Sequence, residues 1–252
     1  MSNLGDGRAF VAVQRVRLGD VTTQGRVRLD ALARYFQDIA ADDAAEAHLP
    51  DDRGWILRRM TYDISRLSTI YEDLEVTTRC TGVGGRWAER TTTLVGNELN
   101  DARTALRPGV LVTARAVWVY VSVDTGTPRS LPEEFFVAYG EGVRANKVSA
   151  RLTHPGPPPD APRVGWVLRS TDFDVFGHVN NALYWVPVED FLAGAGAQHG
   201  VRRATIEFGV GVDPGEHCDL AEVVTEDEFA VWFLVGEEVR ASIRVELAPP
   251  RS

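Results

Sequence analysis

Lysine and cysteine are nearly absent from this chain of 252 residues, and acidic side chains outnumber basic ones. Lys147 is the only lysine, so every other cationic side chain is an arginine. The formal net charge of -9 excludes a general nucleic-acid binder, because such a protein needs a dominant basic surface. Cys80 and Cys218 form neither a disulfide framework nor a metal-binding motif. We therefore expect a protein of the reducing cytoplasm that holds no metal and no other cofactor.

Long apolar runs are also missing. No run approaches the roughly 20 residues that a membrane-spanning helix needs. The N-terminal sequence MSNLGDGRAF has neither a basic region nor an apolar core, so we expect no signal peptide. Hydrophobic residues nevertheless make up 44% of the chain and charged residues 25%, which is typical of a globular protein with a sizeable core.

The first half of the chain predicts one helix followed by long antiparallel strands. Apolar residues at helical spacing predict the helix over about 27–47, with Asp30 as its N-cap, and an alternating strand over 10–18 precedes it. Runs rich in Thr, Val, Ile and Trp then predict strands over 55–66, 74–82, 86–96 and 110–123. We expect an α+β fold in which an antiparallel sheet wraps around a central helix.

The second half repeats this order of elements. A strand is predicted over 164–169, a turn and a helix lead to about residue 198, and strands follow over 204–210, 218–225, 229–235 and 240–247. The dense prolines before residue 163 predict a semi-rigid spacer. We therefore expect an N-terminal domain over 1–140, a Pro-rich linker over 141–162 and a C-terminal domain over 163–252.

The repeat also holds at the level of single residues. A shift of 152 residues (177 minus 25) aligns Asp20 with Asp172, Gly25 with Gly177 and Val27 with Val179. The reactive side chains do not match, because Thr22 stands at the position of Asp174 and Arg26 at the position of His178. This pattern indicates a duplicated unit in which the second copy keeps a site and the first copy is degenerate and holds substrate.

The stretch from Ser170 to Phe191 crowds polar side chains in front of an apolar helix. It contains Asp172, Asp174, Gly177, His178, Asn180 and Asn181. Each of these groups must find a partner when buried, which is a cost that functional sites accept. We expect Asp172 to fix the turn, and Asn180 or Asn181 to cap the helix, to contact a substrate, or both. Pro187 predicts a kink or a broken turn in the helix, and the remaining histidines are expected at the surface: His48, His154, His199 and His217.

The sequence D-F-D-V-F-G-H-V-N-N, with Tyr184 and Glu189 downstream, resembles the signature of hotdog-fold thioesterases. Two further segments, G-W-I-L-R-R at 54–59 and W-V-Y-V-S-V-D at 118–124, resemble strands of the fatty acyl-ACP thioesterase family. Members of that family are tandems of two hotdog units, each an antiparallel sheet wrapped around a central helix. The resemblance covers about residues 10–245 and implies this fold for the whole chain.

The resemblance also implies roles for the residues of the turn. Asp174 and His178 match the family's catalytic residues, Asp174 as a general base on water or as a nucleophile. His178 would orient the water or polarise the carbonyl, and Asn180 and Asn181 would hold the carbonyl, the water or the aspartate. Gly177 lets the backbone approach a ligand closely. A helix that starts near Asn180 would direct N–H groups at the developing oxyanion.

Two positions depart from the family pattern. Phe176, which we assign to substrate binding, stands where the family commonly has Asn. The family also places a Glu or Cys on the strand after the central helix, whereas here Ile206-Glu207-Phe208 is followed by Gly209 to Val212. Glu207 and Asp213 are the carboxylates that would replace it through a shifted register. The turn is closer to the D-x-D-x-x-G-H-V pattern of single-hotdog acyl-CoA thioesterases.

The implied activity is hydrolysis of fatty acyl thioesters, carried by acyl carrier protein, to free fatty acid and carrier thiol in fatty acid biosynthesis. The alternatives are an acyl-CoA thioesterase and a non-catalytic protein that binds acyl chains. An acidic carrier protein needs a local basic patch, for which the candidates are Arg58, Arg59, Arg66, Arg144, Lys147 and Arg151. A tandem hotdog supplies its own pair internally, so we expect a monomer or a homodimer.

Overall fold

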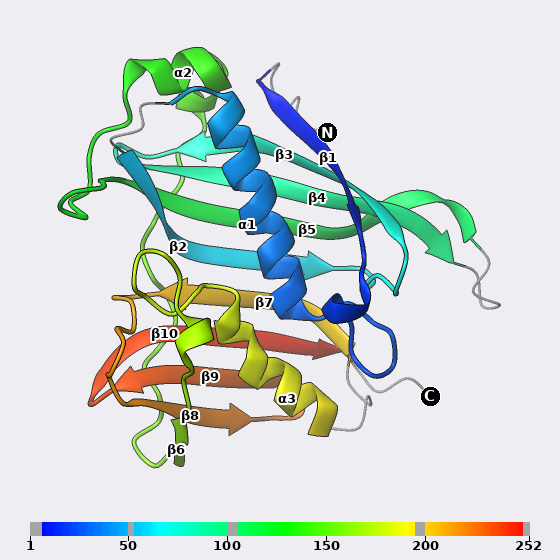
Figure 1. Cartoon of the computed structure of the whole chain (residues 1–252), viewed down its shortest axis with the longest axis vertical. Helices are drawn as coiled ribbons and strands as arrows, with labels where there is room; N and C mark the ends of the chain where they lie inside the picture. The colour runs from blue at the N-terminus through cyan, green and yellow to red at the C-terminus, as the bar shows by residue number, and fades with distance from the viewer. Residues whose placement is uncertain (1–6, 50–52, 100–104, 195–199, 249–252) are drawn as a thin grey trace. The chain divides into compact units, whose positions relative to one another are not determined.

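The computed structural model of the chain describes residues 7–49, 53–99, 105–194 and 200–248. The chain forms two compact units, Met1–Arg151 and Leu152–Ser252. Figure 1 shows that each unit consists of a sheet with one helix across its face, which confirms the predicted α+β class. No helix within the described ranges has the length and apolar character needed to cross a membrane.

Antiparallel strands build the sheet of the first unit in the order β1-β3-β4-β5-β2. Their bounds are β1 Ala9–Arg15, β2 Arg53–Ile64, β3 Asp73–Val83, β4 Trp87–Leu99 and β5 Ala105–Ser122. The runs rich in Thr and Val form strands as predicted, because β-branched side chains pack well on a pleated surface.

Helix α1, Leu29–Glu46, lies across this sheet (Figure 1). Its buried side chains include Leu32, Phe36 and Ile39, which recur every three or four residues and so share one face. The apolar periodicity therefore predicted the helix correctly. The predicted helix end at about residue 47 is also confirmed, because α1 ends at Glu46 and Ala47 is its C-cap.

The prediction that Asp30 caps α1 is wrong. Arg28 occupies the N-cap position, and the buried Asp30 carboxylate is bound by Arg28 Nε at 2.8 Å and Arg34 Nη1 at 2.6 Å. Burial alone would raise the pKa of Asp30, but the hydrogen bonds and charges of the two arginines hold that pKa below its ordinary value. The carboxylate is thus a structural ion-pair partner under the helix start.

The segment after β5 contains a short helix and a 3-10 turn. Helix α2 spans Glu133–Tyr139, and a 3-10 turn, η2, spans Glu141–Ala145. The buried face of α2 carries Phe135, Phe136 and Tyr139, which pack with side chains of β3 and β4 in one apolar cluster. Pro132 stands at the N-cap of α2, where a missing N–H costs nothing.

The sheet of the second unit has the antiparallel order β7-β10-β9-β8-β6. Its strands are β6 Arg163–Trp166, β7 Gly200–Phe208, β8 Cys218–Val224, β9 Glu228–Val235 and β10 Glu238–Ala248. A short 3-10 turn, η3 at Ser170–Asp172, follows β6 and leads into the polar turn.

The helix after the polar turn begins later than predicted. A 3-10 turn, η4, spans Leu183–Trp185, and α3 spans Val186–Gly194, so no helix starts near Asn180. Pro187 lies in the first turn of α3, where its missing N–H breaks no helical hydrogen bond. The sequence predicted this proline inside the helix, with a kink or a broken turn there, whereas the structure places it at the helix start, directly after the 3-10 turn. The predicted helix end near residue 198 lies outside the described residues.

Candidate active site

The polar turn is a tight hairpin closed by main-chain hydrogen bonds. The Asp174 N–H donates to the His178 carbonyl at 2.9 Å, and the Gly177 N–H donates to the Asp174 carbonyl at 3.0 Å. Gly177 has a φ of 79°, the left-handed conformation that a three-residue hairpin loop requires at its last position. This geometry places the Asp174 and His178 side chains at the two ends of the loop.

Asp172 fixes the base of the turn, as expected. Its Oδ2 accepts the Arg169 N–H at 2.8 Å, and its carbonyl accepts the Asn180 N–H at 2.9 Å. Both bonds hold main chain on either side of the loop. Its role in the turn is therefore structural.

The aligned turn of the first unit has the same scaffold. Equivalent main-chain hydrogen bonds join Thr22 N–H to Arg26 carbonyl at 2.8 Å and Gly25 N–H to Thr22 carbonyl at 2.9 Å, and Gly25 has a φ of 78°. Asp20 Oδ2 accepts the Arg17 N–H at 2.9 Å, as Asp172 does in the second unit. The repeat seen in the sequence is thus confirmed in the hydrogen bonding. The first copy has a hydroxyl and a guanidinium where the second has a carboxylate and an imidazole.

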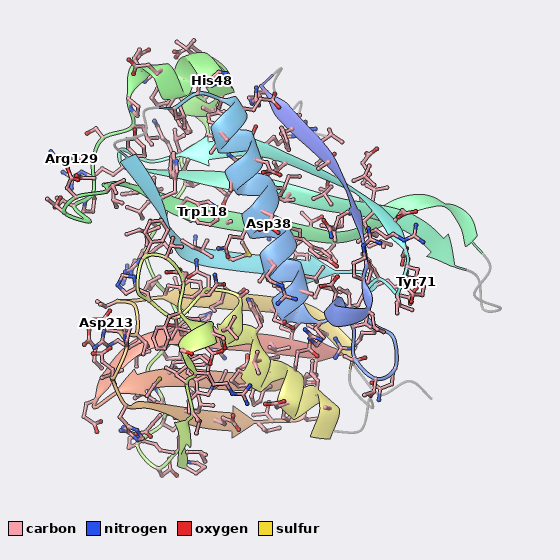
Figure 2. All side chains as sticks on the ribbon, viewed as in Figure 1. Asp38, His48, Tyr71, Trp118, Arg129 and Asp213 are labelled. Carbon is pink, nitrogen blue, oxygen red and sulfur yellow. The ribbon has the colours of Figure 1, made fainter. Side chains whose placement is uncertain are left out.

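His178 packs against the loop of residues 209–216, which joins β7 to β8. The Val179 N–H donates to the Val212 carbonyl at 3.1 Å and so ties the turn to this loop. His178 Nε2 lies 3.3 Å from Asp213 Oδ1, and the two side chains are 49% and 57% exposed. Figure 2 marks Asp213 on this loop. Of the two replacement carboxylates considered from the sequence, Asp213 is the one in contact with the histidine.

Gly211 is a residue that the sequence reasoning missed. A Cβ at this position would lie 2.6 Å from His178 Cδ2 and 2.8 Å from Cγ, so the imidazole rests directly on the glycine backbone. The run G-V-G-V-D-P-G-E at 209–216 was the available signal, because glycines next to a strand mark close backbone approach.

Asp174 and Asn180 have one side-chain oxygen each engaged in the turn. Asp174 Oδ1 accepts the Phe176 N–H at 2.9 Å, and Asn180 Oδ1 accepts the Ala182 N–H at 2.9 Å. Asn180 thus closes a local turn ahead of η4 and is not its N-cap, because Ala182 occupies that position. Among the described residues, none hydrogen-bonds the second carboxylate oxygen of Asp174 or the amide N–H groups of Asn180. Asn180 already binds the Ala182 and Leu183 N–H groups, so these two donors are engaged within the turn, and the expected oxyanion site stays a prediction.

The three substrate-binding candidates differ in exposure. Phe176 is 73% exposed and Val175 beside it is 94% exposed, so an apolar tip projects next to Asp174. Gly177 and Asn181 are half-buried. Their contact with a substrate stays a prediction.

Glu207, considered from the sequence as a replacement catalytic acid, binds the main chain of residues 153–154 in the structure. Its buried carboxylate accepts the Thr153 N–H at 2.8 Å, the Thr153 hydroxyl at 3.0 Å and the His154 N–H at 2.9 Å. His154, expected at the surface, is half-buried, and its Nδ1 lies 2.8 Å from Ser242 Oγ. Glu207 therefore anchors the strap of residues 152–155 to the sheet. A cavity of about 190 Å³ lies beside this strap.

Both cysteines are buried and unreactive. Burial raises the pKa of the Cys80 thiol to about 11 and that of the Cys218 thiol to about 11, the latter with a contribution from the Asp219 charge. A thiol in this state holds almost no thiolate at neutral pH. No group of three metal-ligating side chains is assembled anywhere in the described ranges.

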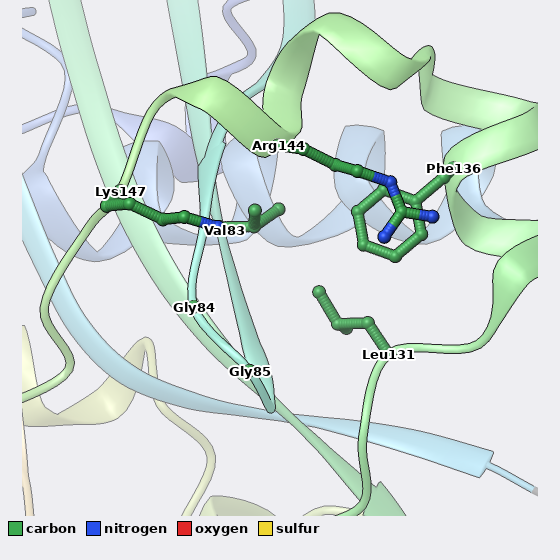
Figure 3. A pocket seen from close by; sticks show the side chains of 7 residues that line it. All are labelled: Val83, Gly84, Gly85, Leu131, Phe136, Arg144 and Lys147. Atoms are coloured by element: carbon green, nitrogen blue, oxygen red, sulfur yellow. The ribbon is translucent and has the colours of Figure 1, made fainter.

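A second cavity, of about 390 Å³, lies in the first unit between the β3–β4 hairpin and α2 (Figure 3). Arg144 covers the Phe136 ring there, with its guanidinium carbon 3.4 Å from the ring centroid, and binds Glu133 and Glu141. Of the other docking candidates, Arg66 pairs with Glu72, and Arg59 donates to the main-chain carbonyls of Ser149 and Arg151. Several of the predicted docking cations are therefore engaged inside the first unit.

Known proteins resemble this chain over nearly its whole length. An uncharacterized protein of Mycobacterium tuberculosis is 27% identical over 237 residues, which cover 94% of this chain and 91% of the relative. Among solved structures, an acyl-ACP thioesterase from Bacteroides thetaiotaomicron superposes with a TM-score of 0.76 at 19% identity, covering 95% of this chain and 98% of that one. The 12:0-ACP thioesterase from Umbellularia californica gives a TM-score of 0.75 at 18% identity, covering 96% and 97%. These superpositions confirm the predicted fold.

The family comparison agrees with the resemblance seen in the sequence. The family model of the acyl-ACP thioesterase N-terminal domain matches residues 7–139, and that of the C-terminal domain matches residues 162–243. Both domains occur in the family's order and together account for most of the chain. The protein belongs to the acyl-ACP thioesterase family of thioester hydrolases.

Proposed function

We propose that the protein hydrolyses fatty acyl thioesters of acyl carrier protein, and that the reaction takes place at the turn of residues 172–181 in the second unit. The observation that carries the proposal is the pairing of a carboxylate and an imidazole on one glycine-closed turn: Asp174 and His178 flank the loop, and His178 in turn contacts Asp213. The aligned turn of the first unit lacks both groups, so the proposal places one site in the chain.

Asp174 acts on the attacking water. Its Oδ1 is held by the Phe176 N–H, which leaves Oδ2 to take a proton as the water oxygen attacks the thioester carbonyl carbon. The carbon–sulfur bond then breaks, the electron pair leaves on sulfur, and the carrier thiolate takes up a proton. The same carboxylate would alternatively attack the carbonyl itself and form an anhydride that water opens. Single turnover in ¹⁸O-labelled water separates the two routes, because only the anhydride route can bring solvent oxygen into Asp174.

His178 and Asn180 complete the site as hydrogen-bonding groups. His178 orients the water or donates to the thioester carbonyl, and its contact with Asp213 fixes the direction of the ring. Asn180, with its Oδ1 engaged by Ala182, points its amide donors at the carbonyl oxygen or the water. Gly177, Phe176 and Asn181 border the entering acyl thioester. No cofactor enters this chemistry.

The family match favours acyl carrier protein over the two alternatives, coenzyme A thioesters and a non-catalytic acyl-binding role. We further propose that the reaction serves fatty acid biosynthesis in the cytoplasm, and that the protein is a monomer or a homodimer. The domains at 1–140 and 163–252 would divide the work, the first holding substrate and the second carrying the chemistry.

The test is release of free thiol from acyl-ACP and acyl-CoA of several chain lengths. Asp174→Asn keeps an oxygen for the Phe176 N–H and removes the base, so we expect a loss of about 10²–10⁴-fold in kcat. Thr22→Ala, at the aligned position of the first unit, is the matched control and should retain activity. Absence of thiol release by the wild type from every substrate contradicts the function, and full activity of Asp174→Asn contradicts the mechanism.

A further inference from the structure

Arg240 is a buried cation at an irregular point of the second sheet. Its side chain is only 10% exposed. It sits in a β-bulge of β10, since Val239 pairs with Leu234 and Ala241 with Phe233, which leaves Arg240 as the extra residue. Bulges re-aim side chains and recur beside active sites. Here the bulge turns the guanidinium toward the loop of residues 209–216.

Arg240 forms hydrogen bonds with three residues of this loop. Its carbonyl accepts the Gly209 N–H at 2.7 Å, where the loop leaves β7. Its Nη1 donates to the Gly211 carbonyl at 2.8 Å, and its Nη2 donates to Glu216 Oε1 at 2.7 Å, where the loop returns toward β8. One residue thus fixes the beginning, the middle and the end of the loop. Gly209 permits this approach, because a Cβ there would lie 2.9 Å from the Val239 carbonyl oxygen.

Glu216 links Arg240 to Asp213 through hydrogen bonds to its two carboxylate oxygens. Its Oε2 accepts the Asp213 N–H at 2.9 Å while its Oε1 receives Arg240. Gly211, the other residue held by Arg240, carries the imidazole of His178 on its backbone. Both surfaces that His178 touches in this loop are therefore set by the same guanidinium.

We propose that Arg240, acting through Glu216 and Gly211, is a positioning residue that holds Asp213 and the backbone of residue 211 against His178. The inference rests on the proposed function of the turn. It adds a residue remote from the reacting atoms, on a strand that the turn does not belong to.

The His178–Asp213 contact is too exposed to fix the position of the two side chains by itself. Both side chains are about half exposed, and an ion pair in that setting contributes little free energy and does not fix a loop. The Arg240–Glu216 pair is much less exposed, and a planar guanidinium binds two oxygens with fixed directions. The rigid pair thus supplies the geometry that the exposed pair uses.

Arg240→Lys tests this, because lysine keeps the positive charge and loses the planar fork. We expect kcat for thiol release to fall about tenfold with KM changed less than about twofold, since the loop orients a catalytic group and binds no acyl chain. Asp213→Asn should lower kcat to a similar extent, and the double variant Arg240→Lys/Asp213→Asn should lose clearly less than the product of the two single losses, because the two residues act partly through the same contact. Glu216→Gln replaces one of the two accepting oxygens with an amide donor, so it keeps only one of the bonds to Arg240 and Asp213 and should show a loss of the same kind.

The matched control is Arg244→Lys on the same strand. Arg244 binds both oxygens of Glu228 at 2.7 and 2.8 Å, away from the loop, so its kcat should stay at the wild-type value. Hydrogen exchange gives a readout independent of turnover. The exchange rate of the Asp213 amide should rise in Arg240→Lys and stay at the wild-type value in Arg244→Lys.

The outcomes separate this inference from the proposed function. A wild-type protein that releases no thiol overturns the function, and the positioning role falls with it. An active wild type in which the two losses multiply in the double variant overturns the positioning role alone. A rise in KM at constant kcat, or unchanged exchange at Asp213, has the same consequence.

Discussion

His178 and Asp213 come together from two separate segments, the turn before η4 and the loop after β7, with Nε2 and Oδ1 3.3 Å apart. The carboxylate therefore approaches the imidazole from a loop and not from the strand itself. The loop residue directly against the ring is Gly211, which has no side chain. The site accordingly combines a backbone floor under the histidine with an acid beside it.

Gly211→Ala tests the backbone floor. The new Cβ would lie 2.6 Å from His178 Cδ2, and the nearest atoms belong to the base and ring of the side chain, so the imidazole must move. We expect kcat to fall by about 10²-fold, because a displacement of about 1 Å in a catalytic group costs that much. Thermal unfolding should change little, since His178 is half exposed. Gly19→Ala, with open space at its Cβ, is the control, and an unchanged kcat for Gly211→Ala contradicts the proposed role of the ring.

The repeat and the turn could be predicted from the sequence because both depend on local information. Gly25 and Gly177 mark left-handed positions, and the aspartates at 20 and 172 mark the bases of the turns, so aligning them recovered the same hydrogen bonds. Apolar periodicity likewise gave α1. These features are set by residues a few positions apart, and their chemistry is legible without tertiary context.

The rest of the site depends on long-range packing. Arg240 is one of several charged residues in its strand, and the sequence does not show that a bulge in β10 turns it toward the loop. Glu207 and Asp213 looked equivalent as replacement acids, but strand alternation buries the first under the strap and the loop carries the second to His178. Pro187 was predicted inside the helix but lies in its first turn, because α3 starts late, after the local bonds that Asn180 makes.

The two acids give opposite predictions. In Glu207→Gln, an amide donor replaces one oxygen that faces the N–H groups of Thr153 and His154, so the free energy of unfolding should fall by about 1–3 kcal/mol. The kcat of Glu207→Gln should stay within about twofold of the wild-type value, because Glu207 anchors the strap. Asp213→Asn should do the reverse, with lower kcat and unchanged stability. Urea unfolding and thiol release on the two variants decide this, and a large kcat loss in folded Glu207→Gln assigns the acid role to Glu207 instead.

Thiol reagents should leave the enzyme active. Burial raises the pKa of Cys80 and Cys218 to about 11, so at pH 8 only about a thousandth of each thiol is ionised. Incubation with iodoacetamide before the assay should therefore cost no activity, and Cys218→Ala should keep its kcat. Loss of activity in proportion to a single alkylated cysteine, abolished by Cys218→Ala, would show that a thiol takes part in the reaction.

His154 should make the stability of the second unit depend on pH. Burial lowers its pKa from the ordinary value of 6.5, against the opposing charge of Glu207. The unfolded chain therefore takes up the proton first as the pH falls, so the stabilising contribution is complete above pH 6.5 and is lost as the pH drops through the lower folded value. Urea unfolding between pH 7 and pH 5 should show the decline, followed by tryptophan fluorescence, to which Trp232 contributes; its Nε1 donates to the Pro155 carbonyl at 2.8 Å in the same strap. His154→Gln should flatten it, whereas exposed His48→Gln should not, and parallel curves for wild type and His154→Gln would assign the decline to other groups.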